Sequence, residues 1–130
     1  MVPGGDGGRY FSGADPASMW YTPINPGDTI VLKAQYSWNY FSMDSYSGTA
    51  ACPIVLMNEG DQVWMTSGIE TRNVKYLKIT GSGDPNTYYG FKIYNPGNDG
   101  AGVAVSVQGK SKVIEIERVD VYKKTYGVLA

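Results

Sequence analysis

Short runs of alternating apolar and polar residues recur along this chain, separated by glycine, proline, asparagine and aspartate. In the clearest run, every second residue from Ile30 to Trp38 is apolar or aromatic, and the residues between them are mostly polar. Alternation of period two predicts a β-strand with one buried and one solvated face. No stretch shows the i, i+3, i+4, i+7 apolar spacing of an amphipathic helix, so we expect no substantial helix.

Turn motifs divide these runs. The sequence Asn-Pro-Gly occurs at 25–27 and again at 95–97, and it predicts tight turns because proline presets φ and glycine accepts a positive φ. The continuous apolar run 53–57 predicts a buried strand, and we expect it to form a hairpin with 62–66. Residues 39–49 are aromatic but interrupted by Ser, Asp and Gly, which predicts a long loop.

Further strands are predicted at 74–80, 89–93, 103–108 and 112–124. In the last of these the apolar parity changes, which predicts a β-bulge near Glu117 and Arg118. The total is about eight strands, with no helix to connect parallel neighbours. The sequence therefore predicts an all-β fold, an antiparallel two-sheet sandwich, with a jelly roll preferred over an immunoglobulin-like sandwich.

The length of 130 residues fits a single domain. We expect a Gly-rich N-terminal arm at 1–8, one β-sandwich domain at 9–124 and a C-terminal tail at 125–130. The start at Met1 without a basic or apolar leader predicts synthesis in the cytoplasm without export. No run approaches the roughly 20 apolar residues of a membrane helix, so we expect no membrane partner.

Composition excludes several kinds of chemistry. The chain has no His and a single Cys, which rules out Ser-His and Cys-His catalysis and His-ligated metal sites. Paired carboxylates remain, but the candidates lie beside predicted turns, so we expect no enzyme activity and no resident metal. These candidates are Asp44, Glu59, Asp61, Glu70 and Asp84. A net charge of −1 gives no basic surface for nucleic acid.

Calcium is the one cofactor for which the sequence offers candidate ligands. Residues 84–86 and 98–100 offer oxygen ligands in Asp-Pro-Asn and Asn-Asp-Gly sequences. Calcium needs six to eight oxygens, and neither segment has the spacing of a known calcium loop. Turn formation is therefore the favoured role of these side chains, and we predict no cofactor.

Aromatic residues are the most informative feature, with 11 Tyr, 3 Trp and 3 Phe. Buried tyrosines each need a hydrogen-bond partner, so a domain of this size is expected to place some on its surface. Rigid surface aromatics either stack on sugars or anchor protein contacts. The candidate binding surface comprises Tyr36, Trp38, Tyr40, Phe41, Tyr46, Trp64, Tyr88 and Tyr89. Trp38 and Trp64 also share strand parities with apolar residues, which favours core positions for both.

Two segments resemble jelly-roll carbohydrate-binding modules. The entry strand at 24–32 and the closing strand at 113–122 are similar to strands of such modules. Related jelly-roll proteins occur in phage tails and as capsid decoration subunits. The resemblance covers about 20 residues of strand pattern and assigns no ligand residues.

Two functions follow as hypotheses. The first is a non-catalytic subunit of a tailed-phage virion, a capsid decoration or tail-associated protein that contacts copies of itself or other virion proteins through aromatic loops and its N-terminal arm. The second is a carbohydrate-binding module that stacks a polysaccharide on surface Tyr and Trp. The first predicts assembly in the cytoplasm into a virion, and the second predicts an extracellular location if the chain is a module of a larger protein.

Overall fold

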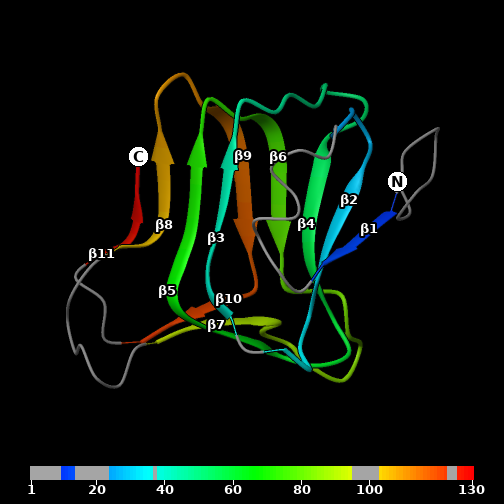
Figure 1. The fold of residues 1–130 in the computed structure, drawn as a ribbon, viewed down its shortest axis with the longest axis vertical. Helices are drawn as coiled ribbons and strands as arrows, with labels where there is room; N and C mark the ends of the chain where they lie inside the picture. The colour runs from blue at the N-terminus through cyan, green and yellow to red at the C-terminus, as the bar shows by residue number, and fades with distance from the viewer. Residues whose placement is uncertain (1–9, 14–23, 37, 95–102, 123–125) are drawn as a thin grey trace.

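Figure 1 shows the fold in a computed structural model of the chain. The structure describes residues 10–13, 24–36, 38–94, 103–122 and 126–130. These residues form eleven strands and no helix, which confirms the prediction of an all-β protein and exceeds the predicted eight strands. The predicted arm at 1–8, the second Asn-Pro-Gly turn and the segment 98–100 lie outside the described residues.

The strands form two sheets in which every pairing is parallel. The first sheet, sheet A, contains Tyr10–Gly13 (β1), Thr29–Lys33 (β2), Ile54–Glu59 (β4), Lys75–Thr80 (β6) and Lys112–Glu117 (β9), in that spatial order. The second, sheet B, contains Trp38–Asp44 (β3), Val63–Arg72 (β5), Phe91–Ile93 (β7), Val103–Gln108 (β8), Val119–Val121 (β10) and Tyr126–Leu129 (β11). Its order is β10-β7-β5-β8-β11, and β3 also pairs with β5.

The chain winds through these sheets as a series of coils. From β2 onward, each coil contributes one strand to sheet A and then one or two strands to sheet B. Each strand pairs with its equivalent in the next coil. The coils are coil 1 (β2, β3), coil 2 (β4, β5), coil 3 (β6, β7, β8) and coil 4 (β9, β10, β11). This is the architecture of a parallel β-helix, in which each coil packs mainly on its neighbours.

Sheet B bends so that each coil has three sides. The first part of β5 pairs with β7 and its last part pairs with β8, and the bend between them contains Gly68 at a φ of 139°. Figure 1 shows β7 and β10 running across the bottom of the view, while β3, β5 and β8 rise along one side.

The predicted antiparallel two-sheet sandwich is therefore wrong, and so are the jelly roll and the immunoglobulin-like alternative. The error came from assuming that parallel neighbours need a helical crossover. In this fold the crossover from one strand of sheet A to the next is made by the strands of sheet B. Alternation of apolar and polar residues appears because each coil buries one face and exposes the other, as an antiparallel sandwich strand also does.

Two local predictions fail for the same reason. Residues 53–57 and 62–66 form no hairpin, because β4 pairs with β2 and β6 in sheet A, whereas β5 belongs to sheet B. The predicted loop at 39–49 is mostly strand, since β3 extends to Asp44 and pairs with β5 from Trp38 to Asp44. The β-bulge predicted near Glu117 and Arg118 is instead a corner between β9 of sheet A and β10 of sheet B, where Arg118 has a φ of 55°.

The first Asn-Pro-Gly turn is confirmed. Gly27 has a φ of 86°, and the Asp28 N–H donates to the Asn25 carbonyl at 3.1 Å. The Asn25 N–H in turn donates to Asp28 Oδ2 at 2.7 Å. This turn leads directly into β2 and fixes where coil 1 begins.

Aliphatic side chains stack from coil to coil inside the helix. In sheet A, Ile30, Leu56, Ile79 and Ile116 occupy equivalent positions in four coils. The first three are buried, and Ile116 packs against the core while remaining partly exposed. Burial of these stacked side chains is the main source of stability in such a fold.

One corner of the coils repeats regularly, and we call it the rear corner. Ser45, Asn73 and Gly109 follow β3, β5 and β8, and all three have φ values between 53° and 64°. The Ser45 N–H donates to the Arg72 carbonyl, and the Asn73 N–H donates to the Gln108 carbonyl. One residue in the left-handed region therefore ends the side strand in three successive coils.

Candidate functional site

The structure separates the predicted aromatic surface into inner and outer residues. Trp38 and Phe41 lie in the core, at 4% and 1% exposure, and Tyr46 is half-buried against it. The backbone of Tyr40 belongs to β3, and its side chain lies outside the described part of the structure. The exposed residues are Tyr36 at 42%, Trp64 at 49%, Tyr88 at 65% and Tyr89 at 49%.

Tyr36 and Trp64 lie at a hollowed corner, which we call the groove corner. It is formed where the chain passes from β2 to β3 and from β4 to β5. Two adjoining hollows of about 400 and 490 Å³ share Ala34, Gln35 and Gln62. The first is also lined by Lys33, Glu59, Gly60 and Asp61, and the second by Tyr36, Trp38, Trp64 and Thr66. Together they form one open groove that crosses coils 1 and 2.

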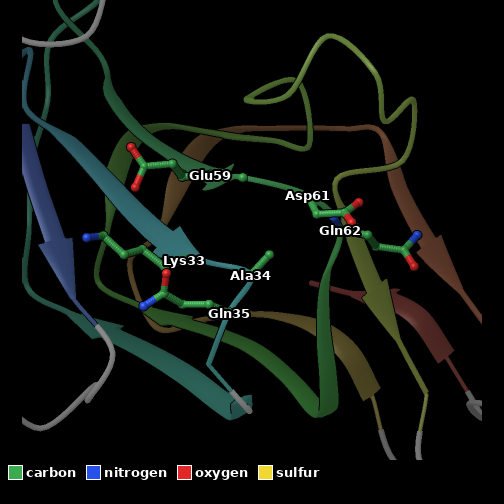
Figure 2. Close-up of a pocket in the computed structure, with 7 residues that line it drawn as sticks. Lys33, Ala34, Gln35, Glu59, Asp61 and Gln62 are labelled. Carbon is green, nitrogen blue, oxygen red and sulfur yellow. The ribbon is translucent and has the colours of Figure 1, made fainter.

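Figure 2 shows how the polar residues of the first hollow are distributed. The side chains of Lys33, Gln35 and Glu59 lie on one side of Ala34, and those of Asp61 and Gln62 lie on the other. The backbone beneath them is fixed, because the Ala34 N–H donates to the Glu59 carbonyl at 2.9 Å. Polar groups therefore flank a small apolar residue along this part of the groove.

The indole of Trp64 is held in place from the side of coil 3. Its Nε1 donates to the Tyr94 carbonyl at 3.2 Å, and its ring lies 6.0 Å from the Tyr94 ring, centre to centre. Lys92 Nζ lies 5.2 Å from the centre of the indole ring. The groove residues Tyr36 and Trp38 come from coil 1, on the opposite side. Trp64 is therefore a rigid, exposed aromatic surface between the groove and coil 3.

Trp38 forms the floor of the same hollow rather than its surface. Its Nε1 donates to the Lys33 carbonyl at 2.9 Å, so the buried indole satisfies its only donor within the corner. This bond spans the turn that carries Ala34 and Gln35 and links the end of β2 to the start of β3.

Asp61 and Gln62 are oriented by hydrogen bonds. Asp61 Oδ1 accepts from the Gln62 N–H at 2.7 Å and from the Thr87 hydroxyl at 3.0 Å. Gln62 Nε2 donates to the Tyr89 carbonyl at 3.0 Å, which leaves its side-chain oxygen as an acceptor. The polar wall of the groove is therefore connected to the loop at 81–90.

That loop is anchored by Asn58, a polar residue with 1% exposure. Asn58 Oδ1 accepts from the Gly83 N–H at 2.9 Å, and Asn58 Nδ2 donates to the Asp61 carbonyl at 2.8 Å. A Cβ at Gly83 would lie 1.7 Å from the Asn58 carbonyl oxygen, and one at Gly90 would lie 2.2 Å from Asn58 Oδ1. Only glycine fits this close approach at both positions.

Tyr88 and Tyr89 extend the aromatic surface beyond the groove. Their rings pack edge to face at 4.9 Å, and the guanidinium of Arg118 lies 4.9 Å from the centre of the Tyr88 ring. Neither tyrosine ring lines the groove. They form a separate patch on the loop at 81–90, which also positions Asp61.

Tyr94 and Tyr122 were not among the candidate binding residues, but they join Trp64 in a row across three coils. The Tyr94 and Tyr122 rings lie 5.0 Å apart. The signal was a spacing of 28 residues, because Met65, Ile93 and Val121 are register partners and each has an aromatic residue next to it. Such a repeat becomes visible only when the coil length is known.

Two ionisable side chains of the described residues have their surroundings defined by the structure. Burial and the nearby Asp44 raise the pKa of the Tyr46 hydroxyl. Asp84 Oδ1 accepts from the Asn86 N–H at 2.8 Å, the turn-forming role expected for it. In the part of the chain that the structure describes, no group of three or more Cys, Asp or Glu residues is placed to hold a metal ion.

The chain matches no known family model, and no curated protein or solved structure matches it. Among the described residues there is no helix of the length and apolar character needed to cross a membrane. A functional proposal therefore depends on the chemistry of the groove corner.

Proposed function

We propose that the chain is a non-catalytic carbohydrate-binding protein whose groove corner receives a polysaccharide. The observation that supports this most is the exposed Trp64 indole, fixed from one side and bordering a groove with polar walls. A sugar ring has an apolar face that packs on an aromatic ring and hydroxyls that need hydrogen-bond partners. The groove offers both kinds of contact in one place.

The polar contacts come from three side chains of the groove lining, and hydrogen bonds orient two of them. Gln35 offers amide donors and an acceptor, Gln62 offers its oxygen, and Asp61 offers carboxylate oxygens. Binding sites commonly combine an apolar or aromatic lining with a few oriented polar groups. A rigid Trp64 loses little conformational freedom on binding, which favours affinity.

The test compares aromatic variants on a glycan array and in affinity gels that contain soluble polysaccharides. Trp64→Ala and Tyr36→Ala should each weaken binding about tenfold or more, in line with the loss of a buried aromatic contact. Tyr89→Ala is the matched control, because Tyr89 is as exposed as Trp64 but lies outside the groove lining. Equal binding by all three variants, or no binding to any glycan, would contradict the proposal.

A second candidate is the assembly role, as a structural subunit of a virion. One observation favours it: the inward-facing residues of coil 4 are less covered than those they stack on. Ile114, Ile116, Val119 and Val121 are partly buried, whereas Leu77, Ile79, Phe91 and Ile93 in coil 3 are at most 1% exposed. A coil whose core face is partly open is covered by packing against a further repeat, and a neighbouring copy would provide that cover.

Light scattering after size-exclusion chromatography tests the assembly role. We expect a defined oligomer that Ile116→Lys converts to monomer, while Glu115→Lys on the outward side of the same strand leaves it intact. A protein that is monomeric at every concentration up to the millimolar range would contradict assembly between copies of this chain.

A further inference from the structure

The charges around the groove bear on which glycan it takes. Asp61 is exposed, and both hydrogen bonds described for its carboxylate go to Oδ1. The donors are a backbone N–H and a threonine hydroxyl, so Asp61 is held in place by neutral groups. Asp61 lines the groove, and its second oxygen, Oδ2, is the carboxylate atom to which neither of these two bonds goes.

The cations of this corner each have an acidic neighbour. Lys33 and Glu59 are register partners on β2 and β4, and both line the groove. Lys92, which contacts Trp64, is the register partner of Asp120 on β10. Neighbouring strands lie about 4.8 Å apart, so each of these lysines has a carboxylate at the adjacent strand position. The described lining thus contains one lysine and two carboxylates.

From this arrangement we propose that the groove selects uncharged glycans, with Asp61 as the residue that determines the selection. This inference rests on the proposed carbohydrate function. A hydroxyl of a neutral sugar donates to Asp61 Oδ2 in a charge-assisted hydrogen bond, which is stronger than a neutral one. A uronate or sulfate at the same place meets the like charge of Asp61. Attraction to one ligand and repulsion of its competitor together set specificity.

The experiment uses two derivatives of one polymer backbone that differ in charge. Hydroxyethyl cellulose is neutral and carboxymethyl cellulose is anionic, and dextran with carboxymethyl dextran gives a second pair. Wild-type protein should bind the neutral member at least tenfold more tightly, with little change between 50 mM and 500 mM NaCl. Asp61→Asn, which keeps the size and the Oδ1 acceptor, should lose about threefold to tenfold on the neutral member. The same variant should gain affinity for the anionic member.

Glu115→Gln is the control, since it removes one carboxylate from an exposed position on β9 away from the groove. It should leave both affinities unchanged, which separates the role of Asp61 from a change in net charge. The melting temperature of each variant shows whether the fold is retained.

Two results would overturn the inference while leaving the carbohydrate function in place. One is tighter binding of the anionic member, weakened by salt but still abolished by Trp64→Ala. The other is an Asp61→Asn variant whose preference for the neutral member equals that of the wild type. Absence of binding to every derivative and to the glycan array would instead contradict the carbohydrate function itself.

Discussion

The rear corner and the groove corner of the coils are built on different principles. At the rear corner, Ser45, Asn73 and Gly109 repeat one backbone conformation and are joined by backbone hydrogen bonds from coil to coil. At the groove corner, the connections range from one residue after β9 to ten after β6, and they are fixed by individual side chains such as Asn58. Repetition serves the stacking of coils, whereas irregular connections on a rigid scaffold can carry a binding site.

The largest expected effect concerns the core that lies between the two corners. Phe41→Ala removes a ring with 1% exposure from β3 and should lower the free energy of unfolding by about 3–5 kcal/mol. Tyr36→Ala, at the groove corner, should change it by less than about 0.5 kcal/mol. Urea denaturation measures both. A comparable loss from the two variants would show that the exposed aromatics of the groove corner are structural.

The next effect tests how the groove corner is held. Gly83→Ala places a Cβ against the Asn58 carbonyl and should cost about 1–3 kcal/mol, with a loss of glycan binding as Asp61 shifts. Gly127→Ala is the matched control, because no atom lies within 4 Å of a Cβ there. If Gly83→Ala matches its control in stability and binding, the close packing around Asn58 does not position the groove.

A smaller effect of opposite sign is expected next to the rear corner. Val113 is the second residue of β9, the strand that follows Gly109 of the rear corner. It has a φ of 57°, and this left-handed conformation costs a β-branched residue about 1–2 kcal/mol. Val113→Gly should therefore stabilise the protein by up to about 1 kcal/mol. Val128 has the same 53% exposure on β11, and Val128→Gly should destabilise by about 0.5–1 kcal/mol. The melting temperatures of the two variants test this. If Val113→Gly and Val128→Gly lower the melting temperature equally, the backbone of Val113 is not strained.

The smallest expected effect is the pH dependence of the last coil. A hydrogen bond from the Thr80 hydroxyl, at 2.7 Å, and contact with Lys78 lower the pKa of Glu117. A carboxyl whose pKa is lower in the folded state stabilises the fold above its unfolded pKa. This contribution is lost as the pH falls through the lowered value.

The melting temperature of wild type should therefore fall more steeply below the ordinary glutamate pKa of 4.5 than that of Glu117→Gln. Glu115→Gln, on the same strand, controls for the removal of one charge. Identical acid profiles for wild type and Glu117→Gln would show that this contact adds nothing to stability.

Part of the candidate site was visible in the sequence. Tyr36, Tyr88 and Tyr89 were candidate surface aromatics, and all three are exposed. The core position favoured for Trp64 is wrong, because its side chain is 49% exposed. Trp38 and Phe41 have aromatic side chains and were candidates for the same surface, yet both are buried. An aromatic side chain suits a core and a binding surface equally well, so its type alone does not distinguish the two. The sheet to which its strand belongs, and the direction of its side chain, make the difference.

The polar half of the groove was less visible. Asp61 was considered only as one of several carboxylates beside a turn, and Gln62 was not considered. Their role depends on Thr87, which lies 26 residues from Asp61, and on the loop at 81–90, which Asn58 anchors through Gly83. Contacts between loops of different coils leave no periodic signal along the chain.

By itself, the sequence determined that this is an all-β chain with a period-two burial pattern, that the first Asn-Pro-Gly segment is a turn, and which catalytic chemistries lack their residues. These features depend on local backbone preference and on residue type. Strand direction, the partner of each strand and the separation of aromatic residues into core and surface were decided only by the tertiary structure. A strand with alternating buried and exposed side chains fits a parallel sheet as well as an antiparallel one. The burial pattern therefore does not set strand direction, and the stacking of whole coils selected the parallel arrangement.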